Sequence, residues 1–127
     1  MKKTLALSLI VILLAACKKD KEETVSLLKK WTVESVVEKE YLDGTLTDTY
    51  TEPGNGATMD FQENGHLIIT RPGNTNESLS YSMLPDSKVN IDGDIFEIKN
   101  LAKSGVILFA KEDIATWRYE TFINLKR

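Results

Sequence analysis

The sequence predicts an all-β fold, an antiparallel up-and-down meander of about eight strands that closes into a small barrel. Three observations support this prediction. Apolar and polar residues alternate with a period of two along most of the chain after Trp31. Turn signals rich in Gly, Asn, Asp and Pro separate the short runs at regular spacing. The only helical pattern is a short N-terminal turn, which Thr24 can cap and which carries Val25, Leu27 and Leu28.

The first hairpin begins at Trp31. Its first strand is expected to have an apolar face and a charged face, formed by Trp31, Val33 and Val37 on one side and by Glu34, Glu38 and Glu40 on the other. Asp43-Gly44 predicts a tight turn, and the threonine-rich residues 45–51 suit the returning strand. A loop follows at residues 53–56, where Pro, Gly and Asn break the pattern.

Further short strands follow, each bounded by a turn. They are expected around residues 59–61, 66–70, 79–83, 89–91, 95–101 and 106–110. The run at 106–110 is apolar on both faces, which indicates a central strand. The last strand alternates most regularly, with Trp117, Tyr119, Thr121, Ile123 and Leu125 on one side; Phe122 alone interrupts the polar side.

The N-terminus has the anatomy of a secretory signal peptide over residues 1–16. Lys2 and Lys3 precede an apolar run from Leu5 to Ala16, which ends in small residues. A transmembrane helix is the alternative, but a spanning helix needs about 20 apolar residues and this run stops before Lys18. The lone cysteine, Cys17, cannot close an internal disulfide and needs another explanation.

The segment Leu14-Ala15-Ala16-Cys17 resembles the lipobox of bacterial lipoproteins. This resemblance implies cleavage after Ala16 and acylation of Cys17. Residues 17–23 then form a lipidated, charged tether. The protein is expected in the cell envelope, anchored by lipid in the outer membrane. The tether resembles export signals to the cell exterior, but a plain spacer is the alternative, so the periplasmic or surface face stays open.

Composition is that of one small folded domain. The chain has 127 residues, of which 42% are hydrophobic and 28% charged. Without Lys2 and Lys3, the mature chain carries 14 Lys and Arg against 19 Asp and Glu, a net charge of −5. An acidic balance argues against nucleic acid as a partner and against electrostatic attraction to anionic lipid.

Residues 24–127 resemble the lipocalin-like domains of small bacterial lipoproteins. A short turn runs into Trp31, Met59-Asp60-Phe61 precedes an Asn-Gly turn, residues 95–101 lead into Val106–Phe109, and the closing strand ends in basic residues. The resemblance implies a barrel plugged at one end by Trp31, with a small apolar molecule held inside. Lipocalins have glycine two residues before this tryptophan, where this chain has Lys29. They also place a basic residue from near the end over it; the candidates are Arg118, Lys126 and Arg127.

The candidate ligand-binding residues are aromatic side chains expected on or near inward faces. With a few hydroxyl groups, they would line a pocket; as an alternative, they form an ordinary core. The candidates are Trp31, Phe61, Tyr81, Phe96, Trp117 and Tyr119, with Phe109 in the same set.

No catalytic or metal site is expected, and no cofactor. His66 is the only histidine and no nucleophile motif accompanies it. Asn90, Asp92, Asp94 and Glu97 supply oxygen ligands, but their order does not fit a calcium loop and a tight turn explains them. Glu112-Asp113 is a carboxylate pair at an expected turn rather than across a cleft.

The sequence therefore favours binding over catalysis, in one of two forms. The first is a membrane-anchored domain that holds a small hydrophobic ligand in its barrel mouth. The alternative is an interaction module with a filled barrel that binds a protein partner in the envelope. Its loops at 52–57 and 71–78, rich in Gly, Asn and Pro, are the candidate contacts.

Overall fold

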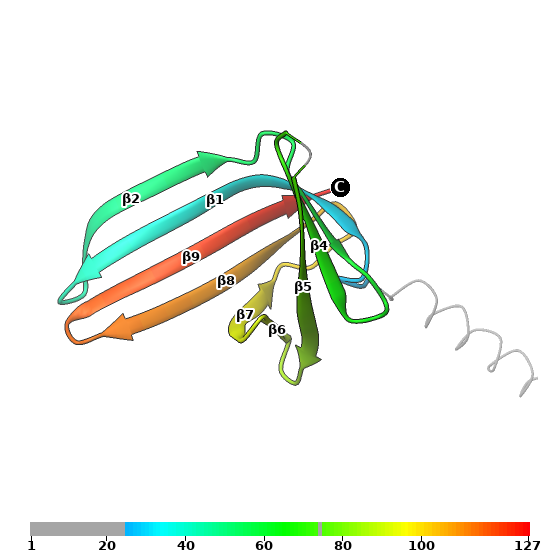
Figure 1. Cartoon of the computed structure of the whole chain (residues 1–127). Helices are drawn as coiled ribbons and strands as arrows, with labels where there is room; N and C mark the ends of the chain where they lie inside the picture. The colour runs from blue at the N-terminus through cyan, green and yellow to red at the C-terminus, as the bar shows by residue number, and fades with distance from the viewer. Residues whose placement is uncertain (1–24, 74) are drawn as a thin grey trace, which may run out of the picture.

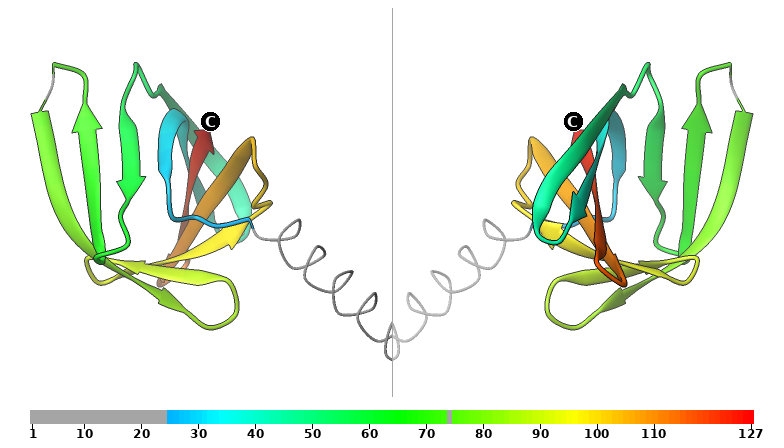
Figure 2. Two further views of the ribbon diagram at one scale, coloured as in Figure 1. Left: turned by 90° about the vertical axis from the view of Figure 1, so that its right-hand side faces the viewer. Right: turned by 90° about the vertical axis from the view of Figure 1, so that its left-hand side faces the viewer.

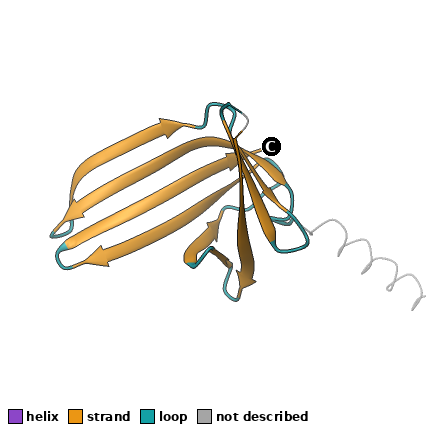
Figure 3. Cartoon of the chain, in the orientation of Figure 1, coloured by secondary structure: helices purple, strands orange, loops and turns teal. Residues whose placement is uncertain are grey.

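The protein is an antiparallel all-β meander, as the sequence predicts. The computed structural model describes residues 25–73 and 75–127, and these contain nine strands and no helix (Figure 3). The strands are β1 (Lys30–Leu42), β2 (Thr45–Pro53), β3 (Thr58–Phe61), β4 (His66–Arg71), β5 (Thr75–Leu84), β6 (Lys88–Ile91), β7 (Asp94–Lys99), β8 (Gly105–Ile114) and β9 (Trp117–Lys126). The signal peptide, Cys17 and the tether lie outside the described residues.

Eight of the strands close a barrel, and β2 stands outside it. From β3 onward, each strand pairs with the next as far as β9, and β1 pairs with both β9 and β3 (Figure 1). Only residues 30–32 of β1 pair with β3; from residue 35 onward, β1 pairs with β2 instead. The expected barrel of about eight strands is therefore confirmed, with one extra strand on the edge.

Four strands run well past the barrel and form a flat extension, defined here as residues 38–50 and 110–121. Its order is β2-β1-β9-β8, and its two hairpin turns lie at the far left of Figure 1. The extension exists because β6 and β7 are short: β7 pairs with residues 107–109 of β8 and leaves the rest of β8 free on that side. In Figure 2, β6 and β7 cross at one end of the barrel, below the standing strands β3, β4 and β5.

A β-bulge in β1 changes which side chains face inward. The β1–β9 register slips between Val33 and Ser35, so Glu34 is an extra residue on β1. As a result Val36, not Val37, faces the core, where it is partly buried. Val37 instead lies opposite Phe122 on the outer face. The prediction that Val37 faces inward with Trp31 and Val33 is therefore wrong, because the bulge reverses the alternation after Glu34.

The same bulge turns two carboxylates inward. Glu38 and Glu40 share a face with Val36, opposite Thr121 and Tyr119 of β9. The sequence pattern places these glutamates on the outer face with Glu34, and that prediction is wrong for the same reason. The inner face of the extension is therefore acidic, whereas the inner face of the barrel is apolar.

The bulge makes Val36 and Val37 a matched pair for mutagenesis. We expect Val36→Asp to lower the free energy of unfolding by about 2 kcal/mol, because it buries a carboxylate against the core without a partner. Val37→Asp is expected to cost less than about 1 kcal/mol, since the carboxylate stays near water. Urea unfolding of both variants measures the difference. Equal losses, or a larger loss for Val37→Asp, would contradict the bulged register.

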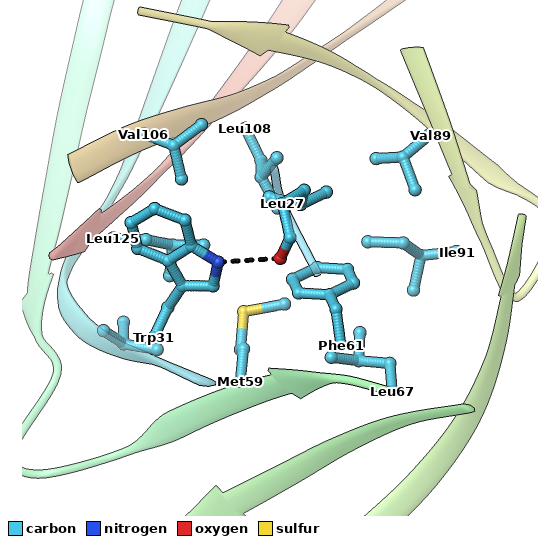
Figure 4. Close-up of a cluster of buried hydrophobic side chains, with 11 residues drawn as sticks. Leu27, Trp31, Met59, Phe61, Leu67, Val89, Ile91, Val106, Leu108 and Leu125 are labelled. Atoms are coloured by element: carbon cyan, nitrogen blue, oxygen red, sulfur yellow. Dashed lines mark hydrogen bonds between the residues drawn. The ribbon is translucent and has the colours of Figure 1, made fainter. Parts of the chain in front are cut away.

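The barrel interior is filled with apolar side chains. Trp31, Leu67, Val89 and Leu108 are 0% exposed, and Phe61 is 2% exposed. Figure 4 shows these residues converging with others of the same cluster: Leu27, Met59, Ile91, Val106 and Leu125, with Val33 completing it. Packing of this kind leaves no room for a ligand at this level of the barrel.

Leu27 closes the end of the barrel, and it does so without a helix. The expected helical turn is absent from the described residues 25–29, where the Lys29 N–H donates to the Leu27 carbonyl at 2.8 Å. The same carbonyl accepts the Trp31 indole N–H at 2.9 Å (Figure 4). A one-turn helix is intrinsically unstable, so burial of Leu27 and its contact with Trp31 determine the local conformation.

A basic side chain does lie over Trp31, but it belongs to Lys29, which precedes β1. The Lys29 Nζ is 4.8 Å from the ring centroid of Trp31. The contact over the ring is therefore made from the position where lipocalins carry glycine, not by Arg118, Lys126 or Arg127. Arg118 pairs instead with Asp113 on the extension, at 3.2 Å. We call the end of the barrel that holds Leu27 and Trp31 the closed end.

Candidate functional site at the barrel mouth

The opposite end of the barrel, its mouth, contains a hollow of about 400 Å³. Five strands and two loops contribute to it. Its floor is apolar and consists of Val33, Val36, Ala57, Met59, Ile69 and Ile123. Its rim consists of Glu52, Pro53, Gly54, Asn55, Arg71 and Pro72. A hollow of this size with an apolar floor and a few polar groups has the character of a small-molecule site.

The β2–β3 loop forms one wall of the hollow and is held firmly against β1. The Gly54 N–H donates to the Glu34 carbonyl at 3.0 Å, and the Ala57 carbonyl accepts the Val33 N–H at 2.8 Å. Asn55 and Gly56 turn the chain with φ values of 52° and 85°. The wall is therefore set by backbone hydrogen bonds and does not depend on a ligand for its shape.

The opposite wall carries an ion pair at the rim. The Arg71 guanidinium binds the Glu77 carboxylate at 2.9 Å, and both side chains are about half exposed. An exposed pair of this kind adds little stability. The pair places N–H donors beside an apolar floor. With Glu52 on the facing wall, the mouth suits a mainly apolar molecule with one polar end.

The aromatic residues predicted to bind a ligand do not line this hollow. Trp31 and Phe61 are buried in the core. Tyr81 packs edge-on against Phe61, with 5.1 Å between ring centroids, and its hydroxyl donates to the Gln62 carbonyl. Burial, then the nearby Glu63 and Asp60, raise the pKa of Tyr81. These three rings are brought together near the closed end, where they stabilise the barrel.

The other candidates lie apart from that group. Trp117 and Tyr119 stack on the inner face of the extension, with 6.3 Å between centroids. Phe96 packs against the core and also lines a second hollow of about 470 Å³ beside Asp94, Ala110, Glu112 and Thr121. Phe109 lies on the outer face, with 4.9 Å between its ring centroid and that of Phe122. The second hollow has a more polar lining than the mouth, so the mouth is the better candidate for an apolar ligand.

The mouth contains none of the aromatic residues predicted to bind a ligand. The sequence predicts the loops at 52–57 and 71–78 as contacts for a protein partner, and the structure places residues 52–55, 57, 71 and 72 at the hollow instead. Residues 75–78 belong to β5 rather than to a loop. The floor residues Val36, Ile69 and Ile123 were not identified, because only the bulge and the closure of the barrel bring them together.

The other residues considered for catalysis or metal binding lie at turns and strand ends. His66 is exposed, and its backbone N–H donates to Asn64 Oδ1 at 3.1 Å. Asn90 Oδ1 accepts the Gly93 N–H at 2.8 Å, so the candidate calcium loop is a side-chain-capped turn. Among residues 25–73 and 75–127, no three His, Cys, Asp or Glu side chains gather as a metal site.

Glu112 and Asp113 point to opposite faces of β8. Glu112 lies opposite Tyr119 on the inner face, and Asp113 pairs with Arg118 on the outer one. The two carboxylates therefore lie on different faces of the sheet.

In the part of the chain that the structure describes, no helix has the length and apolarity to cross a membrane. Searches with family models, curated proteins and solved structures found no match to this chain.

Proposed function

We propose that this protein is a membrane-anchored lipoprotein whose barrel mouth holds a small, mainly apolar ligand. The mouth hollow carries this proposal: its floor is apolar and its loop walls are held by backbone hydrogen bonds. The filled interior limits how deep a ligand goes, so the ligand rests on the core and does not enter it. The Arg71 guanidinium offers N–H donors to a polar end.

The affinity of such a site comes from apolar burial. A ligand that loses about 200 Å² of apolar surface to the floor gains roughly 5 kcal/mol before the costs of association. That gain alone corresponds to a Kd of about 0.2 mM at best. A tighter complex requires the polar end of the ligand to hydrogen-bond at the rim.

Blocking the floor tests this site directly. Ile69 faces the hollow from β4, whereas its neighbour Ile68 faces outward opposite Asp60. With the neutral dye N-phenyl-1-naphthylamine as ligand, we expect Ile69→Trp to weaken binding at least about tenfold, because the indole fills the hollow. Ile68→Trp is the matched control and is expected to bind the dye as the natural chain does.

Fluorescence titration of the natural chain and both variants gives the result, with urea unfolding to confirm that each is folded. Val36→Trp fills the same hollow from β1 and serves if Ile69→Trp does not fold. Absence of dye binding by the folded natural chain, or equal loss in the Ile68 and Ile69 variants, would overturn the proposal.

The membrane anchor rests on the sequence of residues 1–17. Replacing Cys17 by alanine removes the acceptor for the acyl chains. We expect the Cys17→Ala protein to leave the membrane fraction and to lack the added mass of the acyl groups in intact-protein mass spectrometry. Retention of Cys17→Ala in the membrane fraction would show that another feature holds the protein there.

A second candidate function is binding of a protein partner by the extension. The specific observation is the free edge of β2: within the described residues, β2 pairs with β1 alone, and all nine of its residues are exposed. A free edge can accept a strand from another protein. A photocrosslinking amino acid in place of Leu46 would then capture the protein partner. The same amino acid in place of Arg71 would capture the small ligand.

A further inference from the structure

The closed end of the barrel gathers basic side chains. Arg127 lies at the turn before β8, since its N–H donates to the Ser104 carbonyl at 3.1 Å. Lys126 lies opposite both Gly105 and Thr32. The Lys29 carbonyl accepts the Phe61 N–H at 3.1 Å at the same end. We call this group the basic end; its members are Lys29, Lys30, Lys103, Lys126 and Arg127.

The cations of the basic end form no ion pair among the described residues. In the described part of the chain, the ion pairs are Arg71–Glu77, Lys99–Glu97 and Arg118–Asp113, none of which involves the basic end. The neighbouring carboxylates are Asp60, opposite Lys30, Glu63 in the β3–β4 turn, and Glu34, which lines a hollow with Ser104 and Gly105. Burial, then the repulsion of Arg127 and of Lys103, lowers the pKa of Lys29, as expected where cations crowd.

The far end of the molecule has the opposite charge. The inner face of the extension carries carboxylates and no Lys or Arg among the described residues; its acidic members are Glu38, Glu40, Asp48 and Glu112. The mature chain is acidic in total, but a group of positive charges lies at the basic end and a group of negative charges on the inner face of the extension, at the other end of the long axis of the molecule (Figure 1). Net charge alone argued against attraction to anionic lipid, but the separation gives the domain one end that such a surface attracts.

The chain enters the fold at the basic end. The described chain begins at Val25, two residues before Leu27 closes the barrel. Residues 17–24 separate Cys17 from this point, and at roughly 3.5 Å per extended residue they reach at most about 28 Å. A lipid on Cys17 therefore keeps the basic end near the membrane surface, and the extension at a greater distance.

We infer that the basic end docks on an anionic membrane surface, with the acidic extension facing away from it. The inference rests on the proposed lipid anchor. The anchor confines the domain near the bilayer, and the separated charges then select one orientation, because the surface attracts the basic end and repels the extension.

The test supplies the anchor chemically. Residues 25–127 close the barrel, so a chain that begins at Cys17 keeps the fold, and its only thiol can be coupled to a maleimide lipid. The coupled protein is placed on vesicles of phosphatidylcholine alone or mixed with phosphatidylglycerol. Acetylation of individual lysines is followed by mass spectrometry.

On the anionic vesicles we expect acetylation of Lys29 and Lys103 to slow at least about threefold relative to neutral vesicles, and to recover at high salt. Lys39 and Lys111, on the extension, are expected to react equally on both. The double variant Lys103→Glu/Arg127→Glu should lose the protection of Lys29, and Lys111→Glu is the control that keeps it. Equal acetylation of Lys29 and Lys103 on both vesicles, or protection of the extension, would overturn the inference. Neither result depends on whether cells acylate Cys17.

Discussion

Replacing Trp31 by alanine is expected to lower the free energy of unfolding by about 3–5 kcal/mol. Trp31 is 0% exposed and is the largest side chain of the core. Its indole N–H donates to the Leu27 carbonyl, so the substitution opens a cavity and also releases the segment that closes the barrel. Guanidinium unfolding followed by circular dichroism measures this loss.

The control is the second tryptophan. Trp117 lies on the extension, stacked on Tyr119, and is only partly buried. Trp117→Ala is expected to cost about 1 kcal/mol or less, because few core contacts are lost. Trp31→Phe should cost less than Trp31→Ala, since a ring still fills most of the space. A Trp31→Ala loss no larger than that of Trp117→Ala would show that the barrel is not plugged in this way.

Gly54→Ala is expected to be the second most damaging change, with a loss of roughly 3 kcal/mol in stability and a collapse of the mouth hollow. A Cβ at this position would lie 1.7 Å from the Val33 carbonyl oxygen and 2.6 Å from its carbon. These are backbone atoms of β1, so the β2–β3 loop has to move off the strand. The Gly54–Glu34 hydrogen bond would then be lost.

Gly56 in the same loop is the matched control. A Cβ there meets nothing within 4 Å, and its positive φ of 85° is the only strain. We expect Gly56→Ala to cost about 1–2 kcal/mol and to leave the mouth intact. Unfolding curves and N-phenyl-1-naphthylamine titration together separate the two cases. Full dye affinity in Gly54→Ala would contradict the role of this loop as a wall of the site.

The fold was predictable because alternation and turn signals agree along most of the chain. In β9 the pattern runs unbroken from Trp117 to Leu125, and the structure places these residues on one face. Phe122 is the apolar exception on the opposite, outward face of β9, where it packs on Phe109 and lies under Lys39. Tight turns at Asp43-Gly44 and Asp92-Gly93 have the positive φ values that such turns require.

The bulge at Glu34 was not predictable from the sequence pattern. The sequence after Glu34 offers a valine to either face, so the apolar pattern does not show that Glu34 is an extra residue. Val36 and Val37 are equally plausible as inward residues until the register with β9 is known. The inward placement of Glu38 and Glu40 follows from that register alone.

The candidate site was predictable only at its rim. Proline, glycine and asparagine at residues 53–56 and 72–73 identify two loops, but not that they lie at the same end of the barrel. The floor combines Val36, Ile69 and Ile123 from three strands, which depends on barrel closure. Aromatic residues were favoured instead because of their size, and size is also what fills a core.

Native mass spectrometry of the protein purified from membranes, before and after organic extraction, tests the proposed function most directly. The proposal predicts a discrete extra mass beyond the acyl groups, which extraction removes and which Ile69→Trp fails to retain. A mass that is unchanged by extraction, and that stays unchanged when fatty acids, sterols or haem are added, would contradict ligand binding at the mouth. The interaction of the extension with a protein partner would then be the better account of this barrel.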